Sequence, residues 1–138
     1  MIERTLCMIK PDATARHLED EINAMITEHG FKIIASKRLQ ATREQFENFY
    51  IEHKDKPFYS SLVEFMISGP VVVQVLEGEN AIQAWRDFMG DKDPLLVADG
   101  TVRKRFAESK QRNSVHGSSD PESAAREISF WFTPEELQ

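Results

Sequence analysis

The chain has 138 residues, a length typical of one domain that buries a core without disulfide or metal support. Hydrophobic residues make up 41% and charged residues 29%, as in a folded globule rather than a disordered chain. The net charge of −6 argues against a general nucleic-acid binder, which needs a positive field. An anionic ligand would therefore have to be held by a local basic pocket.

Cysteine use and hydropathy indicate the compartment. The single cysteine, Cys7, excludes an internal disulfide and fits a reducing environment, so we expect a cytoplasmic location. Residues 1–12 do not resemble a signal peptide, because Glu3 and Arg4 interrupt a short apolar run. The sequence holds no run of about 18 apolar residues, so we expect no membrane span.

The first part of the chain alternates between strand and helix patterns. Residues 3–9 predict a strand, which Pro11 ends because proline cannot donate a ladder hydrogen bond. Apolar residues at helical spacing predict a helix over 18–30, and residues 31–39 predict a second strand. Residues 42–45 form a capping box, which predicts that the next helix begins there.

The middle of the chain holds the strongest strand signal. Residues 58–68 predict a short helix, and residues 71–77, VVVQVLE, are so rich in β-branched residues that they predict a central strand. Asn80 is expected to cap the helix that follows. The apolar face of that helix is formed by Ile82, Trp85 and Met89.

The segment 90–113 has weak periodicity and many charges. An irregular connection of this length is uncommon in a compact domain and is more often functional. A short strand is predicted over 114–116. Residues 119–122 then form a capping box, with Asp120 as the alternative N-cap. The last long helix is expected to reach about Phe132, with these residues facing inward: Ala125, Ile128 and Phe132.

The predicted order is β-α-β-α-α-β-α-loop-β-α. Four short strands separated by helices indicate an α/β or α+β sandwich with one sheet. A split β-α-β unit of the ferredoxin-like type fits this order. The sequence shows no internal repeat, so we expect residues 1–138 to form a single domain.

Several common chemical motifs are absent from the sequence. It contains no glycine-rich phosphate loop and no G-x-S-x-G nucleophile elbow. The histidines share no metal-ligand spacing, and one cysteine cannot build a thiolate site, so we expect no protein-held metal.

The residues that could carry chemistry gather at strand ends and around the segment 90–113. Arginines and a lysine can cradle phosphate, because guanidinium binds phosphate oxygens bidentately. A histidine beside such a cradle can act as a nucleophile, and Glu127 could fix its tautomer. The candidates are Lys10, Arg86, Arg103, Arg105, Arg112, Asn113 and His116.

Each candidate also has an ordinary structural explanation. A lone histidine is most often a surface or hydrogen-bonded residue, and a basic run is usually solvated. Tyr50 and Phe58 would more often be core residues than ligand stackers, and Glu127 would more often be an exposed helical residue. The residues alone therefore indicate only a domain with a candidate phosphate pocket.

The chain resembles nucleoside diphosphate kinases nearly end to end. The matching stretches are ERTLCMIKPD, GFKIIASKRL, FYIEHKDKPFYSSLVEFMISGPVVVQVLEGENAI, GTVRKRF, NSVHG and ESAAREISFWF. The run NSVHGS is similar to the family's active-site signature, N-x-x-H-G-S. The resemblance implies a ferredoxin-like α/β sandwich with a four-stranded antiparallel sheet. It also implies a ping-pong reaction, in which a nucleoside triphosphate, typically ATP, phosphorylates a histidine and a nucleoside diphosphate takes the group.

The resemblance also implies a role for each matching residue. His116 would be the nucleophile, Ser118 and Glu127 would orient it, and Tyr50 would lie close to it. Phe58 would stack on the base. The positions that match phosphate and ribose ligands are Lys10, Arg86, Arg103 and Asn113. Magnesium would enter bound to the phosphates of the nucleotide.

Family members form dimers arranged into tetramers or hexamers, so the resemblance implies a homo-oligomer. The chain ends soon after Thr133 and Pro134, so we expect no long tail to decide the assembly.

Several positions depart from the family pattern. Lys92 replaces a phosphate-binding threonine, and we expect its ammonium to contact the β- or γ-phosphate unless it is solvated or pairs with a neighbouring aspartate. Asp99 replaces a proline, and Lys110 replaces an aliphatic residue that covers the base. Ser119 and Asp120 reverse the usual Asp-Ser order, and Asp20 also differs, since the family has a glycine there.

Two other functions fit the same residues. One is a nucleotide sensor that binds without transferring phosphate, because a fold alone does not fix function. The other is an interaction subunit whose oligomeric surface is the function. Acid-labile, base-stable label on the protein after incubation with γ-labelled ATP would indicate the enzyme, whereas bound but untransferred ATP would indicate the sensor.

Overall fold

The computed structural model describes residues 1–91, 96–109 and 112–137. These residues contain one four-stranded sheet in the order β2-β3-β1-β4, with every neighbouring pair antiparallel. The strands are β1 (Ile2–Ile9), β2 (Lys32–Leu39), β3 (Val71–Glu79) and β4 (Val115–Gly117). The predicted four-stranded sandwich and the central place of the VVVQVLE run are both confirmed.

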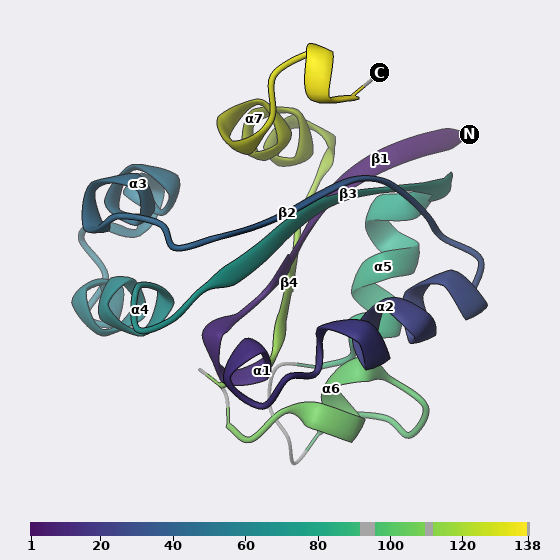
Figure 1. Ribbon diagram of the computed structural model, residues 1–138, viewed down its shortest axis with the longest axis horizontal. Helices are drawn as coiled ribbons and strands as arrows, with labels where there is room; N and C mark the ends of the chain where they lie inside the picture. The colour runs from purple at the N-terminus through teal and green to yellow at the C-terminus, as the bar shows by residue number, and fades with distance from the viewer. Residues whose placement is uncertain (92–95, 110–111, 138) are drawn as a thin grey trace.

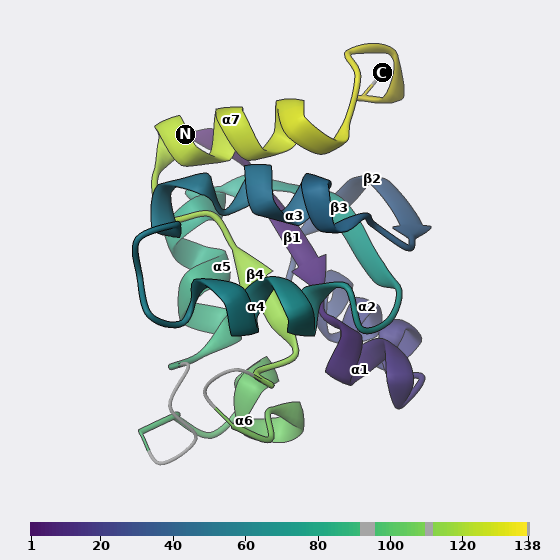
Figure 2. The same ribbon diagram turned by 90° about the vertical axis from the view of Figure 1, so that its left-hand side faces the viewer.

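Helices cover both faces of the sheet (Figures 1 and 2). The helices are α1 (Pro11–Ala15), α2 (Glu19–Glu28), α3 (Arg43–Phe49), α4 (Tyr59–Met66), α5 (Ala81–Met89), α6 (Val102–Phe106) and α7 (Pro121–Trp131). Two short 3-10 turns, η1 and η2, span Ile51–His53 and Glu135–Leu137. Over the described ranges, none of the helices combines the length and the apolar character that a membrane crossing would need.

The core consists of two layers separated by the sheet. Leu6 and Met8 of β1 pack into the layer formed with α3, α4 and α7. Cys7 and Ile9, which point to the opposite face, pack into the layer formed with α1, α2, α5 and α6. The strand β1 therefore has both faces buried and holds the two layers together.

Two short helices were not predicted. Pro11 ends β1 as expected, but it also occupies the first turn of α1, where its missing N–H costs nothing. The segment 90–113 was predicted to be irregular, yet Val102–Phe106 forms α6. The hydroxyl of Thr101 caps that helix by accepting a hydrogen bond from the Lys104 backbone N–H at 3.2 Å.

The predicted role of Asn80 as a side-chain cap is wrong. Asn80 has a left-handed backbone with φ of 48°, and its side chain makes no capping bond. Instead the carboxylate of Glu3 accepts a hydrogen bond from the Ile82 backbone N–H at 3.2 Å. The first turn of α5 is thus capped from β1, 79 residues earlier in the chain.

The helix α7 begins as predicted, with Asp120 as the N-cap and Pro121 in the first turn. The Asp120 carboxylate accepts from the Ser123 N–H at 2.8 Å, and this hydrogen bond is the main cause that lowers the pKa of the carboxyl. The predicted inward position of Ala125 is wrong, because Ala125 is exposed and the preceding alanine is buried. The inward stripe is therefore Ala124, Ile128 and Trp131, followed by the buried Phe132.

Candidate active site

His116 and Glu127 meet where β4 leads into α7. His116 pairs with Met8 across the sheet, and Glu127 lies in the middle of α7. The His116 Nε2 atom is 3.0 Å from Glu127 Oε1. The Ser118 hydroxyl donates to the same oxygen at 2.8 Å, and it accepts from the Leu6 N–H at 3.3 Å. The histidine is therefore tied to the carboxylate and, through Ser118, to β1.

The charge state of Glu127 defines the tautomer of His116. Burial favours a higher pKa for this carboxyl, but the hydrogen bond and charge of His116, together with the Ser118 hydroxyl, hold the pKa below its usual value. An ionised carboxylate only accepts hydrogen bonds, so the proton at this contact is assigned to Nε2. The other ring nitrogen, Nδ1, is then the atom with a lone pair available for attack.

A cavity of about 300 Å³ opens beside His116, with two arginines in its wall. Arg86 comes from α5 and Arg103 from α6, so two helices bring their guanidinium groups to the strand that carries the histidine. Gly117 and Asp91 complete this side of the wall. The result is a local basic pocket in a chain whose net charge is negative.

Arg103 connects two segments of the main chain near this cavity. Its Nη1 donates to the Gly90 carbonyl at 2.9 Å, and its Nη2 donates to the Val115 carbonyl at 2.8 Å. Burial, and then the charge of Arg86, lower the pKa of Arg103 to about 10, while the charge of Asp91 opposes the shift. The side chain therefore stays cationic at neutral pH. Its buried Nε has no hydrogen-bond partner among the described residues, so it is a donor suited to an anion.

A second cavity, of about 350 Å³, also has His116 in its wall. His116 and Arg86 border both cavities, and Tyr50 and His53 reach only the second one. Burial, and then the charge of Glu127, raise the pKa of Tyr50 above its usual range, so its hydroxyl stays protonated. His53 was not predicted as a site residue, although it follows the predicted Tyr50 by three positions.

Lys10 and Asn113 form a buried pair near the end of β1. The Lys10 Nζ donates to the Asn113 side-chain oxygen at 2.9 Å, and both residues are less than a tenth exposed. The Lys10 N–H also donates to the Ser114 carbonyl at 2.8 Å, which extends the pairing of β1 with β4. Both candidates are therefore held close to the strand of the histidine.

Phe58 lies beside the second cavity rather than in the core. It is 48% exposed, and its ring centre is 5.8 Å from that of His53, which lines the cavity. The expectation that Phe58 is a core residue is wrong. Tyr50 is buried in the core and also borders the cavity.

Two predicted cations, Arg105 and Arg112, are not in the walls of the two cavities. Arg105 is 3.5 Å from a carboxylate oxygen of Glu21, and Arg112 packs over the ring of Phe65. The Asp99 carboxylate is 97% exposed and lies 3.9 Å from a lysine ammonium, whereas Ser119 lines the second cavity. Lys92 and Lys110 lie outside the described residues.

Known proteins resemble this chain over nearly its whole length. The family model described as nucleoside diphosphate kinase matches residues 3–137. A nucleoside diphosphate kinase of Rhodospirillum centenum is 57% identical over 136 residues, which cover 99% of this chain and 97% of that protein. One from Methylocella silvestris is 58% identical with the same coverage.

Solved structures show the same architecture. The nucleoside diphosphate kinase of Aquifex aeolicus has a TM-score of 0.96 and 41% identity, and the match covers both chains fully. A nucleoside diphosphate kinase family protein from Babesia bovis has a TM-score of 0.93 and 43% identity, covering 99% of this chain and 92% of that one. The chain belongs to the nucleoside diphosphate kinase family.

Proposed function

We propose that His116 carries the phosphoryl group in a nucleoside diphosphate kinase reaction. In the first half, the γ-phosphoryl group of a nucleoside triphosphate, typically ATP, passes to His116, and the diphosphate leaves. In the second half, another nucleoside diphosphate takes the group and restores the free histidine.

One observation carries this proposal. A histidine with one ring nitrogen fixed by a buried carboxylate borders a cavity that also holds two guanidinium groups. Phosphoryl transfer needs mainly positioning and positive charge around the transferred group, and this arrangement supplies both.

The atoms balance without an external base. The lone pair of His116 Nδ1 forms an N–P bond as the bond from the γ-phosphorus to the bridging oxygen breaks. The bridging oxygen leaves with the electron pair on the diphosphate. The ring becomes a phosphorylated cation that keeps its Nε2 proton, and the Glu127 carboxylate stabilises that charge at 3.0 Å.

The magnesium ion would be part of the substrate rather than of the protein. In the described ranges, no group of three His, Cys, Asp or Glu side chains could hold a metal ion. The cavity wall instead presents Arg86 and Arg103, which suit phosphate oxygens. The residues present therefore fit a Mg²⁺–nucleotide complex in which the phosphates hold the ion.

The remaining candidates have supporting roles in the proposal. Lys10, Arg86, Arg103 and Asn113 bind the phosphates and ribose, and Tyr50 borders the histidine. Phe58 presents an exposed ring on which any base can stack, since every base has a π-face. Lys92 remains a proposed phosphate ligand on the basis of sequence alone.

Assembly and location are also part of the proposal. We expect residues 1–138 to form one domain that assembles as a dimer-based tetramer or hexamer in the cytoplasm. This expectation is supported by the membership of the chain in the family and by a match that covers 99% of this chain and 97% of a relative.

The deciding experiment is a single turnover with γ-labelled ATP and Mg²⁺. The expected result is acid-labile, base-stable label on His116 that is released by added dGDP as labelled dGTP. Bound ATP without transfer would instead favour the nucleotide sensor, and neither binding nor transfer would favour the interaction subunit.

A further inference from the structure

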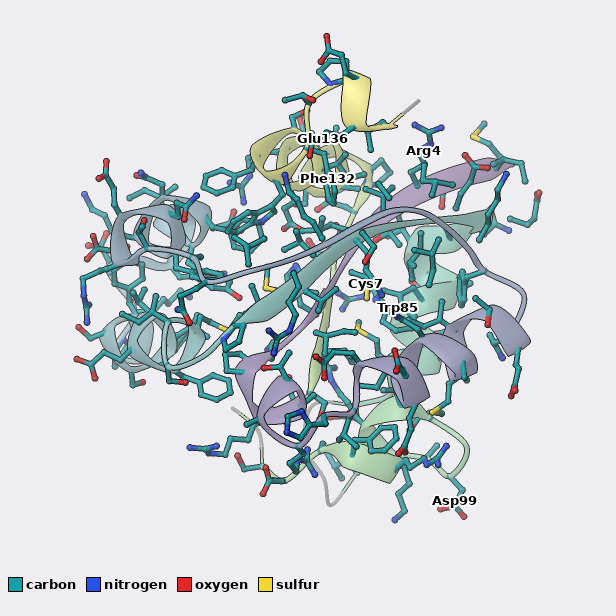
Figure 3. All side chains as sticks on the ribbon, viewed as in Figure 1. Arg4, Cys7, Trp85, Asp99, Phe132 and Glu136 are labelled. Atoms are coloured by element: carbon teal, nitrogen blue, oxygen red, sulfur yellow. The ribbon has the colours of Figure 1, made fainter. Side chains whose placement is uncertain are left out.

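Trp85 contacts the main chain of the residue that carries the proposed nucleophile. Its indole Nε1 donates a hydrogen bond to the His116 carbonyl oxygen at 3.1 Å, and its side chain is fully buried. Figure 3 shows Trp85 beside Cys7, in the layer between α5 and the sheet. The next residue along α5 is Arg86, which lines the cavity. The hydrogen bond from Trp85 therefore links the helix that carries Arg86 to the main chain of His116.

The close approach of the indole depends on Gly117. A Cβ at Gly117 would lie 2.5 Å from Trp85 Cδ1 and 2.8 Å from Trp85 Nε1. It would also lie 2.7 Å from the Met89 methyl group. Atoms do not pack at such distances, so a side chain at position 117 would push the indole away from the carbonyl. The glycine and the tryptophan are therefore a matched pair.

Neighbouring rings hold the indole in this orientation. Phe31 meets it edge-on, with ring centres 5.8 Å apart and planes at 87°, and Phe88 lies 6.2 Å away. Such packing fixes the direction of the N–H group as well as the position of the ring.

The strand β4 needs this support because it has little of its own. It is three residues long, and it lies at an edge of the sheet, so β1 is its only neighbouring strand in the described part of the chain. Side chains from α5 and α6 add two contacts to its main chain, because Trp85 donates to the His116 carbonyl and Arg103 donates to the Val115 carbonyl.

We propose that Trp85 is a positioning residue for phosphoryl transfer, acting through the His116 main chain. Glu127 sets the rotation of the imidazole from the Nε2 side. Trp85 sets the position of the His116 main chain relative to Arg86, which lies on the same helix as Trp85. Together they direct Nδ1 to the phosphorus atom and the guanidinium to the oxygens of the same phosphoryl group. This inference rests on the proposed function of His116.

The expected effect is on the rate rather than on binding. Trp85 is absent from the walls of both cavities, so a bound nucleotide does not touch it. A displacement of the nucleophile by about 1 Å can slow a reaction by roughly 100-fold. Loss of the indole donor should therefore lower the rate constant of His116 phosphorylation by about 10-fold to 100-fold, while nucleotide affinity stays within about twofold.

The test removes the N–H group and keeps the ring. The chain has two tryptophans, so Trp131→Phe leaves Trp85 as the only one. The Trp131→Phe parent protein is produced in two forms, one with tryptophan at position 85 and one with benzothienylalanine there. In benzothienylalanine, sulfur replaces the indole N–H group. Rapid-quench phosphorylation with γ-labelled ATP and Mg²⁺ gives the rate constant. Calorimetric titration with ADP gives the affinity, and thermal unfolding gives the stability.

A second variant separates positioning from stability. Ile26→Val removes one methyl group from the same core layer without touching His116, so it should lower the melting temperature and leave the rate constant unchanged. The proposal is supported if the benzothienylalanine protein is slower than this control at matched stability. Equal rate constants in the two proteins, or a loss confined to ADP affinity, would overturn it.

The same data test the proposed function separately. The tryptophan-containing parent must take label on His116. A parent without that label would overturn the role of His116, and the role of Trp85 with it, whereas a labelled parent with a fast benzothienylalanine protein overturns only the role of Trp85.

Discussion

The two sides of the cavity are built differently. On the nucleophile side, His116, Ser118 and Glu127 form a connected chain of hydrogen bonds at 3.0 and 2.8 Å. On the phosphate side, Arg103 holds two backbone carbonyls but keeps a buried Nε without a partner in the described part of the chain. Arg86, close by, is exposed.

The difference follows from what each side must do. The nucleophile has to keep one orientation before the substrate arrives, so its partners are supplied by the protein. A side chain that donates to a phosphate oxygen must still have a free N–H group when the ligand binds. One N–H group of the guanidinium is therefore left without a partner in the described part of the protein. Substitutions on the nucleophile side should therefore change the rate, and those on the phosphate side should also change binding.

The largest effect is expected for His116→Ala on the nucleophile side. Without Nδ1 no N–P bond can form, so exchange from ATP to dGDP should fall to the uncatalysed level. ADP affinity should change little, because the guanidinium groups remain. A coupled exchange assay and calorimetry measure the two quantities. Exchange close to that of the unchanged protein would show that another residue is the nucleophile.

Arg103→Lys should show the mixed effect of the phosphate side. A lysine keeps the charge but cannot hold the Gly90 and Val115 carbonyls and also reach a phosphate. We expect kcat/KM to fall by more than about 100-fold, since each charge-assisted hydrogen bond contributes about 1.5–3 kcal/mol. We also expect weaker ADP binding and a lower melting temperature.

The control for Arg103→Lys is Arg105→Lys. Arg105 lies on the same short helix and pairs with Glu21 at the surface, so its replacement should leave kcat/KM, ADP binding and the melting temperature unchanged. If ADP binds both variants equally well, the phosphate side does not use Arg103.

The fold was largely predictable because local pattern and packing agree. The β-branched, nearly all apolar run at 71–77 and the capping box at 42–45 are local signals, and the structure has both elements where they were predicted. The helix α6 has only five residues, too few to show a helical period. The cap of α5 was missed because Glu3, which makes it, is distant in sequence.

The candidate site was less predictable from its residues than the fold was. The positions of the residues at strand ends and in the segment 90–113 predicted a histidine near several cations, and only the resemblance distinguished Arg103 from Arg105. Their different surroundings, a buried cavity wall and a surface ion pair, depend on which face of α6 packs against β4. The contact of Trp85 with His116 could not be predicted, because Trp85 looks in sequence like any apolar residue on a helix.

Glu127→Gln should slow transfer without weakening binding, which sharpens the contrast with Arg103. The amide can still contact Nε2, but it cannot stabilise the ring cation that forms on phosphorylation. Changes to groups that orient a reacting residue cost about 10-fold to 100-fold in metal sites, and we expect a loss of that order. Single-turnover phosphorylation and ADP titration measure the two effects. An unchanged rate constant would make Glu127 a structural residue.

The smallest effect is expected for Ser118→Ala, and it should depend on pH. The Ser118 hydroxyl is one of the groups that hold the pKa of Glu127 below its usual value of 4.5. Without it, the pKa should rise toward that value. Because the pKa is lower in the folded protein, the ionised carboxylate contributes stability above the unfolded pKa and loses it as the pH falls through the folded pKa.

The unfolded pKa of Glu127 is the same in both proteins, so the loss of stability in acid should begin at the same pH in Ser118→Ala, but it should be smaller and should be complete at a higher pH. At neutral pH the His116 contact remains, so the rate of phosphorylation should fall by less than about 10-fold, which is below the range expected for Glu127→Gln. Urea unfolding between pH 3 and 7 gives the stability profile, and Ser118→Thr is the control because it keeps the hydroxyl. Parallel profiles for the alanine and threonine variants would show that Ser118 does not set the charge of Glu127. The connected chain on the nucleophile side would then reduce to the His116–Glu127 pair alone.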